Sequence, residues 1–184
     1  MKTHALRQFL LSVVVLGAAL SGSSCGYALA GRGSFLPDTI KVIGIPDFTN
    51  DTTFYQVEQV LTAKVRSEFI GRGKYKVLPQ DTGVDAVLKG EITSIGVTPA
   101  AFNESQQATR YTITVTAKIE FRDVHADKVL WQNPAMLYRE DYDVATATTG
   151  VTDPATFFGQ DVNALNRVAT AFARSVVSAI LEAF

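Results

Sequence analysis

The most regular pattern in this 184-residue sequence is Tyr111-Thr112-Ile113-Thr114-Val115-Thr116-Ala117-Lys118-Ile119-Glu120-Phe121-Arg122. Apolar and polar residues alternate from its first position to its last. Because successive side chains of a β-strand point to opposite faces of a sheet, this period of two predicts a strand with one buried and one wet face. Sheets with one wet face are typically antiparallel, so we expect the strand to lie in a meander.

The segments that flank this strand predict its two partners. Residues 86–97 are strand-like, and their apolar positions change parity between Ile92 and Ile95, which indicates a β-bulge or a strong twist. A return strand is expected over residues 129–144, interrupted by Pro134, which is typical of an edge strand or a bulge. The connecting turns are expected at residues 98–108, 123–128 and 145–152.

The region before this hairpin predicts a βαβ unit with parallel strands. Short β-branched or aromatic runs at 40–45 and 75–78 predict the two strands. Between them, Thr53 and Gln56 have the spacing of a capping box at the start of a helix. The apolar face of that helix comprises Val57, Val60, Leu61, Val65 and Phe69.

A last helix is predicted from about Asp161, after a first helical turn opened by Asp153 and Pro154. Its apolar stripe comprises Leu165, Val168, Ala169, Phe172, Val176, Ala179 and Ile180. Arg167 and Arg174 lie off that stripe. We expect the stripe to pack in the core, and a membrane-surface helix is the alternative. The elements together predict an α+β fold, a two-layer sandwich with two helices packed on one face of a four- or five-stranded mixed sheet.

The start of the chain has the features of a secretory signal. Lys2 and Arg7 precede an apolar run at 9–20, and small residues follow up to Cys25. The run is too short to span a bilayer comfortably. We expect residues 1–24 to be a lipoprotein signal peptide that is cut before Cys25, which would then carry acyl chains such as palmitate. Ordinary cleavage and release is the alternative.

The sequence has one cysteine, so an exported chain has no internal disulfide to explain it. Several acyl chains on Cys25 would anchor the protein stably to a membrane. The glycine-rich segment 25–38 is expected to be a tether, and residues 39–184 a single domain.

Composition and residue types argue against several classes of protein. Removing two basic residues with the signal leaves 15 basic against 18 acidic residues, a net charge of −3, which disfavours a nucleic-acid binder. The one histidine of the mature chain, His125, lies in an expected turn. No cluster has metal-ligand spacing. We therefore predict no enzyme activity, no catalytic residues, no metal site and no cofactor.

Several segments in order resemble the LptE family of lipopolysaccharide-assembly lipoproteins. They are Cys25-Gly26-Tyr27, residues 42–50, residues 85–92, residues 111–122 and Leu130-Trp131. The resemblance implies an outer-membrane lipoprotein on the periplasmic side. It also implies that the protein plugs the LptD β-barrel in a 1:1 complex, helps that barrel to assemble, and binds lipopolysaccharide on its way to the cell surface.

The resemblance further implies basic residues that contact lipopolysaccharide phosphates near the sheet's hairpin tips. The tip at 102–108 has no Lys or Arg, so Arg110, Lys118 and Arg122 are the candidates, chosen by charge and position. Arginine pairs phosphate through two parallel hydrogen bonds.

The segment at 43–52 also resembles lipoproteins that activate peptidoglycan synthases, and curli-secretion subunits. A structural outer-membrane lipoprotein without a ligand is a third alternative.

Overall fold

The structure is a computed structural model that describes residues 36–72, 74–148, 154–160 and 162–183. The predicted signal peptide, Cys25 and most of the predicted tether lie outside the described residues. In chain order the elements are β1 (Val42–Gly44), β2 (Thr49–Asn50), α2 (Val57–Gly71), β3 (Lys76–Leu78), β4 (Ala86–Phe102), β5 (Ala108–Asp123), β6 (Lys128–Thr148), α3 (Pro154–Gln160) and α4 (Val162–Leu181).

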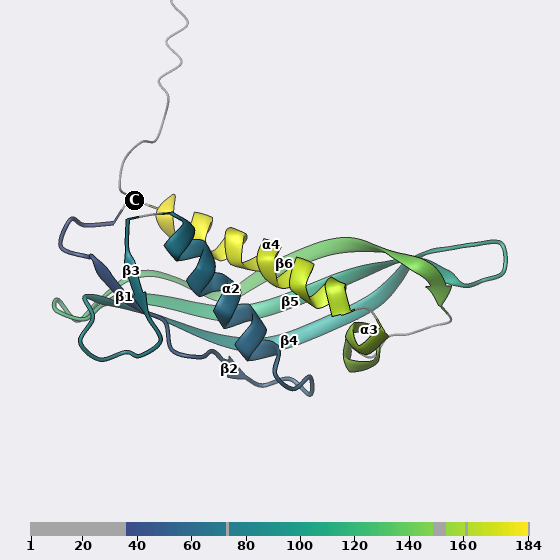
Figure 1. Cartoon of the computed structure of the whole chain (residues 1–184), viewed down its shortest axis with the longest axis horizontal. Helices are drawn as coiled ribbons and strands as arrows, with labels where there is room; N and C mark the ends of the chain where they lie inside the picture. The colour runs from purple at the N-terminus through teal and green to yellow at the C-terminus, as the bar shows by residue number, and fades with distance from the viewer. Residues whose placement is uncertain (1–35, 73, 149–153, 161, 184) are drawn as a thin grey trace, which may run out of the picture. The chain divides into compact units, whose positions relative to one another are not determined.

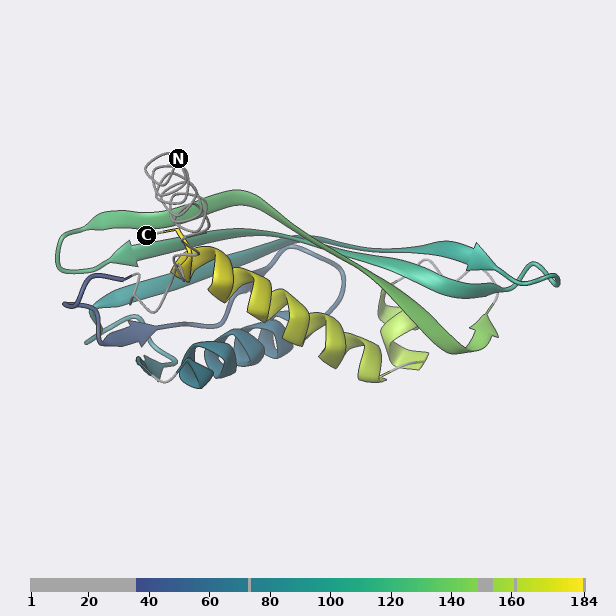
Figure 2. The same ribbon diagram turned by 90° about the horizontal axis from the view of Figure 1, so that it is seen from above.

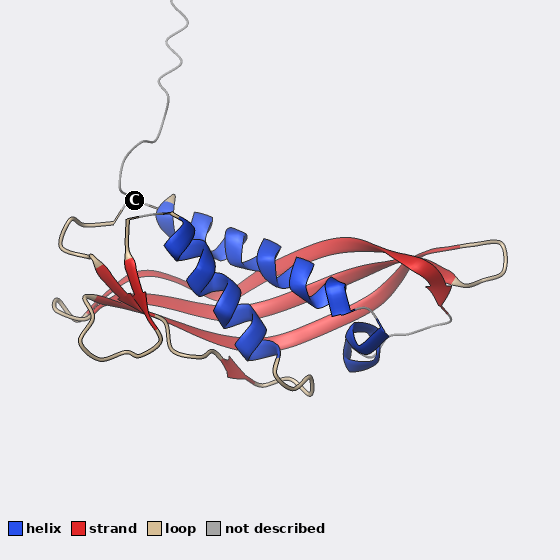
Figure 3. Ribbon diagram, viewed as in Figure 1, coloured by secondary structure: helices blue, strands red, loops and turns tan. Residues whose placement is uncertain are grey.

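The strands form one mixed sheet in the order β3-β1-β4-β5-β6 (Figure 1). β1 pairs in parallel with both β3 and β4, and β4, β5 and β6 form an antiparallel meander. The helices lie on one side of this sheet (Figure 3). The predicted two-layer α+β sandwich with a mixed sheet is therefore confirmed.

The sheet has six strands because it also contains a short strand, β2, that the sequence analysis does not predict. In β2, Thr49 and Asn50 pair in parallel with Glu91 and Ile92 of β4. The Asp51 amide extends this pairing by donating to the Ile92 carbonyl at 2.9 Å. Two residues are too few to show the period of two that indicates a strand. The hydrogen-bond partners of this strand also lie about 40 positions away in the sequence.

The hairpin of β4 and β5 is longer than predicted. The expected irregularity between Ile92 and Ile95 is confirmed as a register shift between Ile92 and Ser94. The expected tip at 98–108 is wrong at both ends, since β4 continues to Phe102 and β5 begins at Ala108. The turn between them is closed by the Asn103 side-chain oxygen, which accepts the amide hydrogens of Ser105 and Gln107.

The return strand β6 is an edge strand with an irregular register, as Pro134 predicts. The shift lies where Ala117 and Ile119 of β5 face Met136 and Asn133 of β6. β6 also runs to Thr148, so the loop expected at 145–152 begins later than predicted. Past Asp143, Thr148 pairs with Ala108 of β5, so the two strands meet again beyond the predicted start of the loop.

The start of α2 differs from the predicted capping box. Gln56 has a φ of 68° and caps nothing with its side chain. Asn50 braces this turn instead: its side-chain amide donates to the Phe54 carbonyl at 2.9 Å and to the Glu58 carboxylate at 2.8 Å. Its side-chain oxygen accepts the Thr52 amide hydrogen at 2.9 Å. The left-handed turn at Gln56 takes that residue out of the geometry that a capping box needs.

The core lies between the sheet and the helices α2 and α4. The buried face of α2 comprises Val57, Leu61, Thr62, Val65 and Phe69, which includes four of the five predicted residues. α4 is long and apolar enough to cross a membrane, but Val168, Phe172, Val176 and Ile180 are buried in the core. The predicted core packing of this stripe is therefore confirmed.

Candidate functional site

No described helix covers the face of the sheet opposite α2 and α4 (Figure 2). Alternation in β5 directs its even-numbered side chains, from Arg110 to Arg122, to this face, because the odd-numbered ones from Tyr111 to Phe121 are buried. We call this surface the open face. At the centre of the open face, three adjacent strands contribute residues that pair with one another across the sheet. They are Ser94, Gly96 and Thr98 of β4, Thr112, Thr114 and Thr116 of β5, and Leu137, Arg139 and Asp141 of β6. Hydroxyl and small residues thus occupy the β4 and β5 part of this centre, whereas β6 adds the charged residues Arg139 and Asp141.

Arg110, Lys118 and Arg122 all lie on the open face, and each contacts a carboxylate. Arg110 Nε lies 2.6 Å from Asp143 Oδ1. Lys118 Nζ lies 3.5 Å from Glu91 Oε2 across the strand pair. The partners of Arg122 are Glu120 at 3.0 Å and Asp127 at 2.9 Å.

These ion pairs further stabilise the charged form of the arginines, which are protonated at neutral pH in any case. The hydrogen bond that Arg110 donates to Asp143 raises the pKa of the Arg110 guanidinium above its ordinary value. The hydrogen bonds that Arg122 donates to Glu120 and then to Asp127 raise the pKa of Arg122 in the same way. Both pairs are exposed, so water and salt screen them and they add little to stability.

The structure does not gather the three predicted cations into one site. At about 3.3 Å per residue, Arg110 lies roughly 26 Å along β5 from Lys118, and Lys118 lies roughly 13 Å from Arg122. An anionic ligand would also compete with the carboxylate that each cation already contacts. Binding of lipopolysaccharide at these residues stays a prediction.

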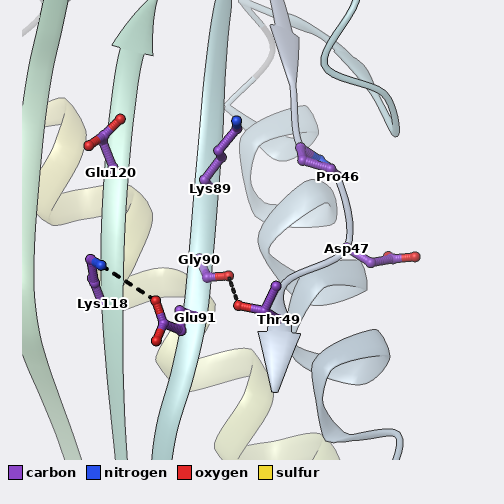
Figure 4. Close-up of a pocket in the computed structure, with 8 residues that line it drawn as sticks. All are labelled: Pro46, Asp47, Thr49, Lys89, Gly90, Glu91, Lys118 and Glu120. Atoms are coloured by element: carbon purple, nitrogen blue, oxygen red, sulfur yellow. Dashed lines mark hydrogen bonds and ion pairs between the residues drawn. The ribbon is translucent and has the colours of Figure 1, made fainter. Parts of the chain in front are cut away.

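A pocket of about 410 Å³ lies beside Lys118 on the open face (Figure 4). Its lining residues are Pro46, Asp47, Thr49, Lys89, Gly90, Glu91, Lys118 and Glu120. Lys89 faces Glu120 across the strands, and the Thr49 hydroxyl donates to the Gly90 carbonyl at 3.5 Å. The mixed charge of the lining suits a polar partner surface better than a simple anion.

Sequence reasoning did not find this pocket. Its wall at Thr49 belongs to β2, which the sequence did not reveal. The alternating charges of Lys89 and Glu91 were the one available signal.

A second hollow, of about 530 Å³, lies between β6 and the outer side of α4. It is lined by Glu140, Asn163, Asn166, Arg167, Thr170, Ala171 and Arg174. The Arg167 guanidinium lies 4.7 Å from the centre of the Tyr142 ring and 3.7 Å from Glu140. Burial, and then the hydrogen bond to Glu140, raises the pKa of the Tyr138 hydroxyl. The contacts of Arg167 tie α4 to the edge strand.

His125 lies in the turn between β5 and β6, as predicted. Its Nε2 is 3.2 Å from Asp85 Oδ1. The other Asp85 oxygen accepts the amide hydrogens of Lys41 at 2.9 Å and Val42 at 2.8 Å. These backbone hydrogen bonds, and then the bond from His125, lower the pKa of Asp85. The pair joins β1 to the turn and has the contacts of a structural brace.

Within the described ranges, no group of three or more His, Cys, Asp or Glu side chains could hold a metal ion.

Comparison with known proteins identifies one matching family. The family model described as "LptE: Lipopolysaccharide-assembly" matches residues 40–180. A comparison with curated proteins finds no match.

Among solved structures, the hypothetical protein CT253 from Chlamydia trachomatis is similar in fold, with a TM-score of 0.50, 11% identity, and coverage of 77% of this chain and 95% of that one. The PelC dodecamer from Paraburkholderia phytofirmans gives a TM-score of 0.48 at 16% identity, covering 82% of this chain and 94% of that one. Lipoprotein GNA1162 from Neisseria meningitidis gives a TM-score of 0.42 at 17% identity, covering 70% of this chain and 98% of that one.

Proposed function

This chain belongs to the LptE family of lipopolysaccharide-assembly proteins, and from that premise we propose that it is an outer-membrane lipoprotein that plugs an LptD-type β-barrel. It would face the periplasm, help the barrel to assemble, and bind lipopolysaccharide during delivery to the cell surface. The family match, which spans both the sheet and α4, is the observation that carries the proposal.

The chemistry of the open face supports a place inside a barrel. The interior of an outer-membrane barrel is polar, whereas its outer wall is apolar. Hydroxyl side chains such as Thr112 and Thr114 occupy the centre of the open face, and Leu137 is its one large exposed apolar residue within the described ranges. Such a surface can exchange hydrogen bonds with a polar wall, and it would bury too little apolar area to hold a membrane by itself.

Membrane attachment in this proposal depends on Cys25. Acylation there would hold the protein on the periplasmic side of the outer membrane, because two or more chains anchor stably. The mass of the amino-terminal peptide from membrane-purified protein tests this step. A peptide that begins at Cys25 and carries acyl chains supports it, and an unmodified or longer peptide contradicts it.

Direct contact with lipopolysaccharide is assigned to Arg110 and Lys118, with Arg122 as the third cation. Charge reversal of Arg110 and Lys118 to Glu should weaken binding of purified lipopolysaccharide by at least tenfold if both contact phosphates, since a charge-assisted hydrogen bond contributes about 1.5–3 kcal/mol. Arg66→Glu is a control for one such charge reversal, because Arg66 belongs to α2 and binds Asp47 and the Ile45 carbonyl. Equal affinity of the double variant and the wild type would refute this assignment.

The partner is tested by a photo-crosslinking residue in place of Thr114, at the centre of the open face. We expect an adduct with the lumen-facing side of an outer-membrane barrel. An adduct with a peptidoglycan synthase or a secretion channel would support the alternative functions instead, and no adduct would leave the open face without a partner.

A further inference from the structure

One edge of the sheet is a long and regular strand segment. Strand β6 is the outermost strand of the sheet and pairs with β5 alone (Figure 1). From Met136 to Asp143 it pairs with β5 without a register shift. This segment contains neither proline nor lysine, since the proline of β6, Pro134, precedes it. We call residues 136–143 the regular edge.

The regular edge offers backbone groups to a further strand. A strand with one neighbour directs about half of its N–H and C=O groups away from that neighbour. Within the part of the chain that the structure describes, no hydrogen bond from outside β5 reaches the backbone of residues 136–141. The other edge of the sheet is blunted by shortness, because β3 has only three residues. Only the β6 side therefore presents a long template for pairing.

The space beside the regular edge is basic on the helix side. The hollow of about 530 Å³ is lined there by Glu140 of β6 and, from α4, by Arg167 and Arg174. Arg167 lies 3.7 Å from the Glu140 carboxylate, and Arg174 makes no ion pair with any described residue. Both arginines are exposed. The hollow thus holds two guanidinium groups against one carboxylate.

A strand added to the regular edge would meet different chemistry on its two faces. Its side chains would alternate between the faces, with about 6.8 Å between neighbours on one face. On the helix side they would enter the hollow, where Arg167 and Arg174 are about 10.5 Å apart along α4. Acidic side chains at alternate positions would pair with both arginines by charge-assisted hydrogen bonds. On the open face, apolar or hydroxyl side chains would cover Leu137, which is 57% exposed.

A second copy of this chain fits the regular edge less well than an acidic segment. Pairing of two copies about a two-fold axis would bring both hollows together on the helix side. Arg167 and Arg174 of each copy would then share only the two Glu140 carboxylates. A free anion could neutralise the arginines, but it would leave the backbone groups of the regular edge without partners.

We propose that β6 is a site of strand addition, at which an extended acidic segment of a partner protein pairs with the regular edge and places its carboxylates in the hollow beside Arg167 and Arg174. Backbone hydrogen bonds would supply affinity in this mode, and the alternating side chains would supply specificity. The inference goes beyond the proposed function and requires neither a barrel nor lipopolysaccharide, so its failure leaves both of those proposals unaffected.

The test uses full-length protein purified from membranes in mild detergent. The probe is a fluorescent peptide, Thr-Glu-Val-Glu-Thr-Glu-Val-Glu-Thr, whose binding is followed by anisotropy. Two further versions carry N-methyl groups on the odd or on the even residues. We expect one of these versions to lose at least tenfold in affinity and the other to bind like the parent, because only one set of N–H groups can point towards β6. Hydrogen exchange at residues 136–141 should slow at least threefold when the parent peptide is bound.

The side-chain half of the proposal is tested by charge reversal. Arg167→Glu with Arg174→Glu should weaken peptide binding at least tenfold. Lys74→Glu with Lys76→Glu is the matched control, since it reverses two exposed charges at the short edge strand β3 and should leave binding unchanged. Circular dichroism melts establish that all variants are folded.

Three results would overturn the inference: no binding at 1 mM peptide, equal affinity for the two methylated versions, or unchanged affinity of the arginine variant. A dimer in sedimentation that itself protects residues 136–141 from exchange would assign the regular edge to a second copy, and would overturn it as well.

Discussion

Replacing Gly90 with Ala should destabilise the protein, because this glycine leaves room for an aromatic ring. A Cβ at Gly90 would lie 2.7 Å from three ring carbons of Phe48, closer than real Cβ atoms approach other carbons. Phe48 is only 3% exposed, and its amide donates to Thr62 Oγ1 at 3.0 Å, so the ring has little freedom to move away. Gly90 also lines the pocket on the open face, so the change tests how that wall is held.

The magnitude follows from two opposing terms. Overpacking a core costs about 1–3 kcal/mol, and replacing glycine within a strand returns about 0.5–1 kcal/mol of backbone entropy. At the middle of both ranges the net loss is about 1 kcal/mol, which should lower the melting temperature by roughly 2–4 °C for a domain of this size.

The measurement is urea unfolding followed by circular dichroism and by the fluorescence of the single tryptophan, Trp131. Gly96→Ala is the matched control, because Gly96 lies on the same strand and nothing stands within 4 Å of its added Cβ. We expect Gly96→Ala to be as stable as the wild type or slightly more stable. If Gly90→Ala unfolds at the same urea concentration as Gly96→Ala, the proposed packing of Phe48 on Gly90 is wrong.

Three further predictions follow from the core and from the Asp85 brace. Thr62→Val should lower the free energy of unfolding by about 1–3 kcal/mol, because it leaves the buried Phe48 amide without its acceptor. Thr93→Val, at an exposed position, is the control in the same chemical unfolding assay, and a loss for Thr62→Val no greater than that of Thr93→Val would contradict the prediction. Phe172→Ala should cost about 3–5 kcal/mol by the same assay, since Phe172 is fully buried, and a cost under 1 kcal/mol would show that α4 does not pack as described. In the folded protein the pKa of Asp85 is lowered. The ionised carboxylate therefore stabilises the fold fully at pH values above the ordinary carboxyl pKa, near 4, and this stabilisation is lost as the pH falls through the lower folded-state pKa. The stability difference between wild type and Asp85→Ala should therefore be full at pH 6 and shrink below pH 4, and a difference independent of pH would refute the brace.

The architecture was predictable where side-chain periodicity reports burial directly. The alternation in residues 111–122 predicts β5 with its buried and open faces, and the parity change after Ile92 predicts the irregularity in β4. The apolar stripe of α4 predicts its buried side in the same way, because every third or fourth residue contacts the core.

The differences arise where distant backbone or side chains determine the local structure. β2 exists because β4 offers backbone partners to Thr49 and Asn50, and the start of α2 depends on the Asn50 side chain. The pocket on the open face joins Pro46 to Lys118, two residues that belong to separate parts of the sequence. Local pattern also placed Arg110, Lys118 and Arg122 on the correct face, but their carboxylate partners became visible only with the strand register.

The central claim, that this chain forms a complex with an LptD-type barrel, is tested most directly by purifying the tagged protein from membranes in mild detergent and quantifying what accompanies it by mass spectrometry. The account predicts one large outer-membrane β-barrel protein in a 1:1 ratio to the bait. A peptidoglycan synthase or a secretion channel at that ratio, or no stoichiometric partner, would contradict it.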